Sequence, residues 1–266
     1  MSTFNSTGAV SQSITRTGRN EPFELQVARG QITFHNEQNV FAYGTTPATA
    51  GTFRTVWENM ATTEYVFPTS ALTMQLASDN AADTAKVTIV GLDANYAAIS
   101  ETLTLNGTTN VPTTNQYLRI NSMFVATGSA TNPIGVITLK NSTVTYAQIN
   151  TAVFNGVTSS VGQTQMAIFT VPAGYTFYGQ RYGAYSSFNG NSANYTTYRA
   201  VTNSSAGVQK LIVQTPFNTN YEVQRHYPLP YAEKTDLRWQ IAPSAAVAAV
   251  VSINIGGILI KNDGSL

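Results

Sequence analysis

The sequence predicts an all-β protein made of two antiparallel β-sandwich or jelly-roll-like units, preceded by an extended N-terminal arm. Short segments of alternating apolar and polar residues recur along most of the chain, and turn residues separate them at short intervals. No segment has convincing helical periodicity. The Ala-rich stretch PSAAVAAVVSI contains several β-branched residues and continues into a strand pattern, which favours a strand.

Residues 1–22 form the predicted arm. They are rich in Ser, Thr, Asn and Gly, and their isolated apolar residues cannot form a core. Such a segment is either a flexible tail or an arm that becomes ordered on a neighbouring subunit, and we favour the second interpretation.

Residues 23–155 are the first predicted unit. FELQVARGQITFHNEQNVFAYG suggests strands around an Arg29-Gly30 turn and again at residues 39–43. Further on, VTIVGLDANYAAISETLTLNGTTNV contains two alternating runs with turn residues between and after them, which predicts a hairpin. The segments ALTMQLAS, QYLRINSMFVATG and VITLKNSTVTYAQI continue the same pattern.

Residues 156–266 are the second predicted unit, which begins after the polar segment VTSSVGQTQ. Its strand-like segments include YTFYGQRYGAYSS, YEVQRHYPLP and DLRWQIAP. Pro172 and Gly174 predict a tight turn within VPAGYTFY. The apolar run AAVAAVVSINIGGILI is interrupted by polar residues and glycines, so we interpret it as a buried strand pair and not a membrane span.

The composition narrows the possible partners. Only 10% of the residues are charged and the net charge is +1, so no global field attracts nucleic acid or an anionic membrane. Cysteine is absent, which excludes disulfides, thiolate metal sites and cysteine nucleophiles. The first residues do not have the features of a signal peptide. We therefore expect neither a membrane partner nor direct binding to nucleic acid.

The residues that could support catalysis are few. The chain has two histidines, His35 and His226, and lacks the serine-hydrolase elbow motif. Glu58, Glu64 and Glu101 could supply a carboxylate pair for glycoside hydrolysis, but nothing in the sequence selects a pair. We therefore expect no enzyme, no catalytic residues, no cofactor and no cofactor-binding residues.

A metal site is not expected either. The loop SDNAADT offers Asp79, Asn80 and Asp83, but it lacks the central glycine and distal glutamate of a calcium loop. We interpret it as a solvated turn.

Tyrosine is abundant in YTFYGQRYGAYSSFNGNSANYTTYR. These rings could stack on sugars, form a protein interface, or simply pack inward from half-buried strands. Arg181 and Arg199 raise the possibility of single-strand nucleic-acid binding, but two cations over this span are too few to favour it.

Several phrases together carry a family resemblance. VTIVGLDANYAAISETLTLNGTTNV, the upstream EPFELQVARGQITFHNEQNVFAYG and TVWEN, and the downstream VPAGYTFYGQRY resemble structural proteins of tailed-bacteriophage virions. The resemblance covers most of the chain. It implies an all-β protein attached to the capsid or tail, made in the host cytoplasm, with no enzymatic residues to transfer. Because decoration proteins of this kind commonly sit at local threefold points, it also implies a homotrimer.

The resemblance and the low charge together predict a capsid decoration, or cement, protein. It would bind the major capsid protein on the capsid exterior and stabilise the shell. Burying neutral hydroxyls and amides against neighbours costs less than burying unpaired charges. The candidate partner-binding residues lie where the arm meets the first strand: Arg16, Arg19, Phe23 and Arg29.

Two alternatives remain open. The chain could be a tail or receptor-binding component whose tyrosine-rich second unit recognises host glycans. It could also be a virion protein that degrades polysaccharide, the alternative with the least support.

Overall fold

The computed structural model describes residues 21–188 and 194–262, and it is nearly all β. Its strands form several antiparallel sheets, so the predicted all-β, sandwich-like fold class is confirmed. Most of the predicted arm, including Arg16 and Arg19, lies outside the described residues.

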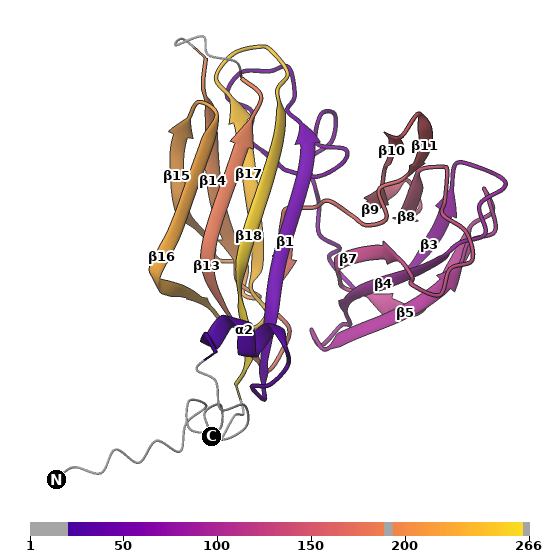
Figure 1. The fold of residues 1–266 in the computed structure, drawn as a ribbon, viewed down its shortest axis with the longest axis horizontal. Helices are drawn as coiled ribbons and strands as arrows, with labels where there is room; N and C mark the ends of the chain where they lie inside the picture. Colours follow the sequence, from indigo (N-terminus) through magenta and orange to yellow (C-terminus); the bar gives the residue numbers. More distant parts are fainter. Residues whose placement is uncertain (1–20, 189–193, 263–266) are drawn as a thin grey trace.

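The larger part of the fold is a sandwich of two sheets, which we call the sandwich unit (Figure 1). Sheet A contains, in spatial order, β1 (His35–Thr45), β18 (Val250–Lys261), β13 (Tyr175–Ser186) and β16 (Asn220–Tyr231). Sheet B contains β12 (Ile168–Thr170), β17 (Asp236–Pro243), β14 (Thr196–Asn203) and β15 (Gln209–Phe217), and β2 (Arg54–Thr55) pairs with β17.

The strands between residues 72 and 160 form a second body, which we call the inserted unit (Figure 1). Sheet C contains β6 (Val111–Tyr117), β3 (Leu72–Ser78), β8 (Ile137–Asn141) and β9 (Val144–Ile149). Sheet D contains β5 (Ala98–Thr104), β4 (Lys86–Leu92) and β7 (Arg119–Val125). A separate hairpin contains β10 (Thr151–Phe154) and β11 (Val157–Ser160).

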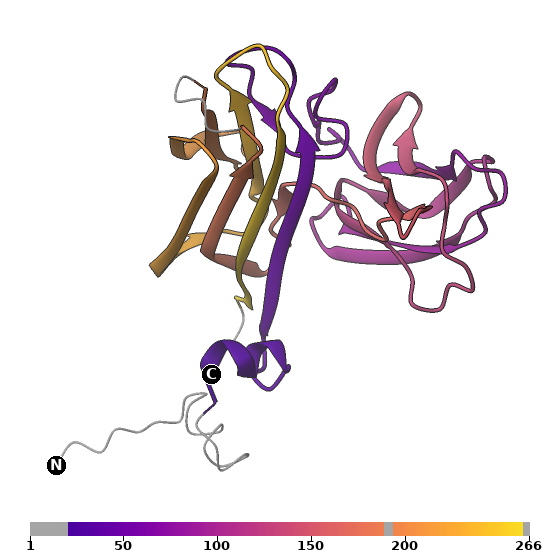
Figure 2. The same cartoon turned by 45° about the horizontal axis from the view of Figure 1, so that its top comes forward.

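The pairing of β1 differs from the predicted division at residues 155 and 156. β1 pairs along its whole length with β18, from His35 opposite Ile260 to Thr45 opposite Val250. The sandwich unit therefore combines strands from both ends of the described chain, and residues 72–160 are inserted between β2 and β12. Figure 2 shows the inserted unit beside β1 from a second direction.

The expected strand before the Arg29-Gly30 turn is wrong, because Phe23–Ala28 forms the short helix α2. The backbone amide of Arg29 donates to the Leu25 carbonyl at 3.0 Å, as in a helix. Gly30 then adopts a φ of 65°, the left-handed conformation that commonly ends a helix. The apolar run near the C-terminus also differs from expectation, since it forms the single strand β18 instead of a strand pair.

The local turns agree with the sequence. β4 and β5 form the predicted hairpin, with Val87 opposite Leu103. Asp93 fixes its loop, because Oδ1 accepts hydrogen bonds from the backbone amides of Asn95 and Ala97 at 2.8 and 2.9 Å. Gly174 has a φ of 77° in the predicted turn that opens β13.

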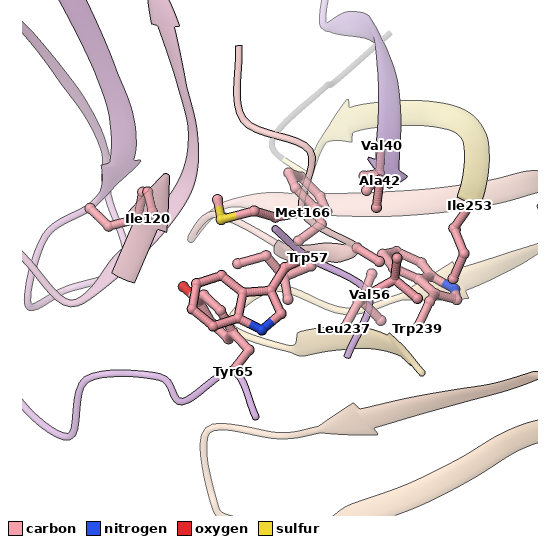
Figure 3. Packing of buried hydrophobic residues seen from close by; sticks show 14 of the residues in the cluster. Val40, Ala42, Val56, Trp57, Tyr65, Ile120, Met166, Leu237, Trp239 and Ile253 are labelled. Atoms are coloured by element: carbon pink, nitrogen blue, oxygen red, sulfur yellow. The ribbon is translucent and has the colours of Figure 1, made fainter. Parts of the chain in front are cut away.

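One hydrophobic core extends through both units. Figure 3 shows it passing from Ile120 of the inserted unit, past Trp57, to Trp239 of sheet B. Trp57 is fully buried and packs edge-on against Tyr65, with ring centroids 5.4 Å apart. Continuous apolar packing therefore joins the two units and fixes their relative position.

A buried polar junction lies beside this core. Arg119 of β7 forms a two-point ion pair with Asp236 of β17, with N–O distances of 2.7 and 2.9 Å. Arg119 Nη1 also donates to the backbone carbonyl of Pro68 at 2.8 Å, and Thr170 Oγ1 donates to Asp236 at 2.7 Å. The guanidinium lies 4.9 Å from the centre of the Phe67 ring. These contacts satisfy both charges within the chain.

Candidate interaction surfaces

Of the four predicted partner-binding residues, only Phe23 and Arg29 lie within the described residues, and each has its own contact within the chain. Phe23 is an exposed residue in α2 and packs edge-on against His35 at 5.7 Å. Arg29 follows the helix, and its Nη1 contacts both carboxylate oxygens of Glu21 at 2.7 Å. The charge of Arg29 is thus already paired with Glu21 within the chain. Whether these residues contact a partner stays a prediction.

The outer face of sheet A is an open surface of aromatic and neutral polar side chains. We define this face by three rows of paired residues across β1, β18, β13 and β16. The rows are Tyr43–Ser252–Tyr185–Asn220, Phe41–Asn254–Gly183–Glu222 and Asn39–Gly256–Arg181–Gln224. In Figure 1 this face is turned toward the viewer, and α2 lies at its lower end.

The outer face of sheet A contains three exposed aromatic side chains, Phe41, Tyr43 and Tyr185. Among its defined members, only Arg181 and Glu222 are charged. The Tyr185 hydroxyl donates a hydrogen bond to Glu222, and this contact raises the pKa of Tyr185 above its ordinary value. An uncovered sheet face of this composition can contact another macromolecule without stripping water from many charges.

A hollow of about 300 Å³ lies on this face around Gly183. Because Gly183 has no side chain, the polar groups of Arg181, Gln224 and Asn254 surround an open space beside the Tyr185 ring. A Cβ atom at Gly183 would come no closer than 3.5 Å to its neighbours, which is ordinary contact distance. The hollow can therefore be filled by substitution without forcing the backbone to move.

The tyrosine-rich segment divides between the core and the surface. Tyr182 and Tyr198 are buried between the sheets, and burial raises the pKa of both hydroxyls. Tyr185 and Tyr195 are exposed. Residues 189–193 of this segment lie outside the described residues. Inward packing therefore explains some of these tyrosines, but not Tyr185 on the outer face of sheet A.

The two arginines of this segment lie on different sheets. Arg181 is on the outer face of sheet A, whereas Arg199 is in β14 of sheet B. The guanidinium of Arg199 lies 3.8 Å from the centre of the Phe53 ring, and its Nε donates to Gln240 at 2.7 Å. The structure therefore does not combine them into one basic track.

The three glutamates considered for glycoside hydrolysis each have structural contacts of their own. Glu64 accepts hydrogen bonds from the Thr55 hydroxyl at 2.7 Å and from Gln240 at 3.0 Å. Glu101 accepts from the backbone amides of Thr114 and Asn115 at 2.9 and 3.3 Å.

Glu58 differs from the other two because burial raises its pKa to about 8. Its Oε1 accepts a hydrogen bond from the Gln165 backbone amide. Its Oε2 is shielded from solvent and has no hydrogen-bond partner among the described residues, although the residue as a whole is only partly buried. This environment favours the neutral carboxylic acid.

The loop interpreted as a solvated turn is partly buried. Asp83 is 4% exposed and accepts hydrogen bonds from the Ser78 hydroxyl and from the backbone amides of Ile134 and Gly135. Its carboxylate thus holds the segment before β8. Within the described residues, no group of three or more His, Asp or Glu side chains could hold a metal ion.

The histidines have local contacts. His35 Nδ1 lies 2.8 Å from the Thr33 carbonyl, and the exposed His226 packs against Tyr227. In the described part of the chain, no helix is long and apolar enough to cross a membrane.

Two further apolar surfaces belong to the inserted unit and its border. The β10–β11 hairpin exposes Val153, Phe154 and Val157 at its tip, with exposures of 69%, 54% and 64%. A groove of about 430 Å³ lies between the units, where β1 of sheet A and β4 and β7 of sheet D contribute to its walls. Neither surface was predicted from the sequence. The sequence does contain a signal for the hairpin tip, because apolar residues lie on both sides of the Asn155-Gly156 turn.

Sequence comparisons assign no family to the chain: no protein-family model matches it, and no curated protein sequence is significantly similar. Among solved structures, a mitogen derived from Yersinia pseudotuberculosis (YPM) is 12% identical, with coverage of 38% of this chain and 88% of that chain and a TM-score of 0.22. The Gt strain of infectious bursal disease virus gives 10% identity, coverage of 92% and 79%, and a TM-score of 0.21.

The VP2 subviral particle of infectious bursal disease virus gives 8% identity, the same coverage and a TM-score of 0.19. Viral capsid proteins are thus among the weak structural neighbours of this chain. TM-scores this low carry no argument about its function.

Proposed function

We propose that the chain is a virion structural protein that decorates the outside of a tailed-phage capsid and stabilises the shell. The observation that carries the proposal is the outer face of sheet A, which the described residues leave exposed, which is nearly neutral, and which contains the exposed rings of Phe41, Tyr43 and Tyr185. Aromatic side chains are enriched in the cores of protein interfaces, and charged side chains are depleted there.

Two features of the sequence support the same role. The whole chain has 10% charged residues, so a large contact can form with few ions to desolvate. The phrase VTIVGLDANYAAISETLTLNGTTNV and its companions resemble virion structural proteins. The proposed partner is the major capsid protein, with Phe23 and Arg29 contributing from the adjacent α2 region, and the proposed assembly is a homotrimer.

The test is to count this chain in purified virions by quantitative mass spectrometry and to measure rebinding to particles that lack it. We expect hundreds of copies per virion. Tyr43→Ser combined with Tyr185→Ser should weaken rebinding by roughly tenfold or more, because two exposed anchors are lost.

Tyr195→Ser is the matched control. Tyr195 is 44% exposed, close to the 47% of Tyr43, but it precedes β14 of sheet B instead of lying on the outer face of sheet A. Its substitution should leave rebinding unchanged. A handful of copies at one vertex, or equal losses for control and test variants, would contradict the decoration role.

A tail or receptor-binding role is the second candidate, and the hollow at Gly183 favours it. A sugar ring can stack on Tyr185 while its hydroxyls reach the charged and amide groups of Arg181, Glu222 and Asn254. This role predicts binding to glycans of the host surface, with few copies per virion.

Gly183→Val tests the second candidate, because the added Cβ has ordinary contact distances to its neighbours and the two methyl groups take up space in the hollow. Glycan-array binding by the wild-type chain that is lost in this variant would support the receptor-binding role. Gly128→Val is the control, since an added Cβ there meets no atom within 4 Å. An absence of glycan binding by the wild-type chain would leave decoration as the remaining proposal.

A further inference from the structure

The tip of the β10–β11 hairpin is apolar on both faces. Phe154 and Val157 are paired across the ribbon and share one face, whereas Val153 lies on the opposite face. A sheet that covers a core is apolar on one face only. A tip with exposed apolar groups on both faces instead fits a site that surrounds it.

The hairpin is also held in place before any partner arrives. Its two-residue loop, Asn155 and Gly156, has φ values of 52° and 80°, as a tight hairpin turn requires. At the base of the ribbon, the Ser160 amide donates to the Pro133 carbonyl at 2.8 Å, and Asn132 donates to Ser159 at 3.0 Å. A preorganised tip loses little conformational freedom on binding.

The groove between the units has matching chemistry. Its accessible apolar side chains are Phe41, which also belongs to the outer face of sheet A, and Phe124, with exposures of 43% and 38%. Behind them the groove is floored by buried apolar side chains such as Leu92, Met123 and Phe169. Its polar lining groups are amides and hydroxyls, such as Asn121, and none of its described lining residues is charged.

The sequence places the tip and one wall of this groove in the same neutral stretch. No charged residue occurs between Lys140 and Arg181, an interval that contains both the hairpin and the groove residues 163–172. The absence of lysine and arginine around the tip argues against an anionic membrane as its partner. Neither surface would have to desolvate an ion when it is covered.

We propose that the hairpin tip of one copy inserts into the groove between the units of a second copy, so that this chain associates head to tail. The tip is exposed in the folded chain and so does not occupy its own groove. Such a contact uses two different surfaces and leaves one of each free on a dimer. Repetition closes into a ring when the rotation allows it and otherwise gives an open filament. A closed ring of three copies would be the homotrimer proposed above.

The first test is sedimentation velocity on the purified full chain. We expect the wild-type chain to form concentration-dependent oligomers. The tip variant, Phe154→Ser with Val157→Ser, replaces two apolar side chains of the hairpin tip with polar ones. The groove variant, Ala98→Glu, places a charge at an exposed position in the groove. Each variant alone should associate at least roughly tenfold more weakly than the wild type, and should therefore be monomeric at concentrations where the wild type forms oligomers. Val208→Ser, which changes an exposed valine outside both surfaces, should behave like the wild type.

Mixing the two variants provides the decisive result. The groove variant keeps an intact tip and the tip variant keeps an intact groove, so an equimolar mixture should form a species of two chains and nothing larger. A wild-type chain that remains monomeric at its highest soluble concentration would overturn the proposal. Oligomers that persist in the tip variant would also overturn it.

Disulfide trapping checks the same contact without relying on loss of association. The natural chain has no cysteine, so Val157→Cys in one copy and Ala98→Cys in another introduce single thiols. Mild oxidation of the mixture should give mostly the mixed disulfide. Equal yields of mixed and like-with-like disulfides would indicate random collision and overturn the proposal. Neither test requires a virion, so this inference can fail while the decoration role stands, or the reverse.

Discussion

The junction between the two units and the outward apolar surfaces use charge in opposite ways. At the junction, Arg119 and Asp236 are both buried, and neighbouring groups of the same chain satisfy them. The hairpin tip and the groove contain no charged residue among their described members. The outer face of sheet A has charge only at Arg181 and Glu222.

We attribute the difference to the contact that each region would make: the junction forms within the chain, whereas the outward surfaces are proposed to meet another molecule. An ion pair within one chain is desolvated once, during folding, and its partners are fixed at short distance by the same sheets. A surface that meets another molecule must give up its water at each encounter, so unpaired ions there oppose association. If the outward surfaces make the contacts proposed for them, those contacts form with few or no ions to desolvate, unlike the junction.

The largest expected effect is at the junction. Asp236→Ala leaves the Arg119 guanidinium buried without its carboxylate, and we expect the free energy of unfolding to fall by about 3–5 kcal/mol. Urea unfolding at neutral pH measures this loss.

The double substitution Arg119→Met with Asp236→Leu is the control for that prediction. It removes both charges, so no ion is left uncompensated, and it should recover much of the stability lost in Asp236→Ala. A single variant as stable as the wild type would mean that water or local rearrangement satisfies Arg119.

Local features of this fold could be predicted from the sequence. The β4–β5 hairpin has its strands, turn and Asp93 within one short stretch, so the pattern of residues contains the whole signal. The turn at Gly174 is local in the same way. The α2 segment was misassigned because alternation over six residues is too short to distinguish a helix from a strand.

Partners distant in the sequence could not be predicted. The alternating pattern of β1 fits any neighbouring strand, and its pairing with β18 follows from the packing of the whole sandwich. Arg119 and Asp236 are 117 residues apart, and Asp83 reads as an ordinary turn residue until residues 134 and 135 are brought beside it. The outer face of sheet A depends on the same distant pairings.

A smaller effect is expected at Glu58, a shielded carboxyl group to which the described residues supply no cationic partner like that of Asp236. Its pKa is about 8 in the folded chain and near 4.5 when unfolded, so the folded state binds more protons between these values. Stability should therefore be highest below about pH 4.5, as far as this group is concerned, and should fall as pH rises toward 8. The expected fall in the free energy of unfolding is on the order of 2 kcal/mol. This is less than the full difference in pKa would give, because water screens the charge of a residue that is only partly buried.

Glu58→Gln isolates this contribution. The amide keeps an oxygen for the Gln165 backbone amide but cannot ionise, so the variant should lose the dependence on pH and exceed the wild type most at pH 8. Urea unfolding of both proteins at pH 5 and pH 8 gives the comparison. Parallel changes in the two proteins would show that water or a rearranged neighbour solvates the Glu58 carboxylate.

The smallest effect on stability is expected at the outward surfaces. Phe154→Ser at the hairpin tip and Tyr43→Ser on the outer face of sheet A should each change the unfolding free energy by less than about 0.5 kcal/mol, because both positions are exposed on the surface, at 54% and 47%. The measurement needs dilute, monomeric protein, since association would stabilise the folded state. A loss above about 1 kcal/mol at either position would mean that the side chain packs within its own chain. Near-zero changes would instead mean that folding does not require these exposed rings, unlike the ion pair at the junction.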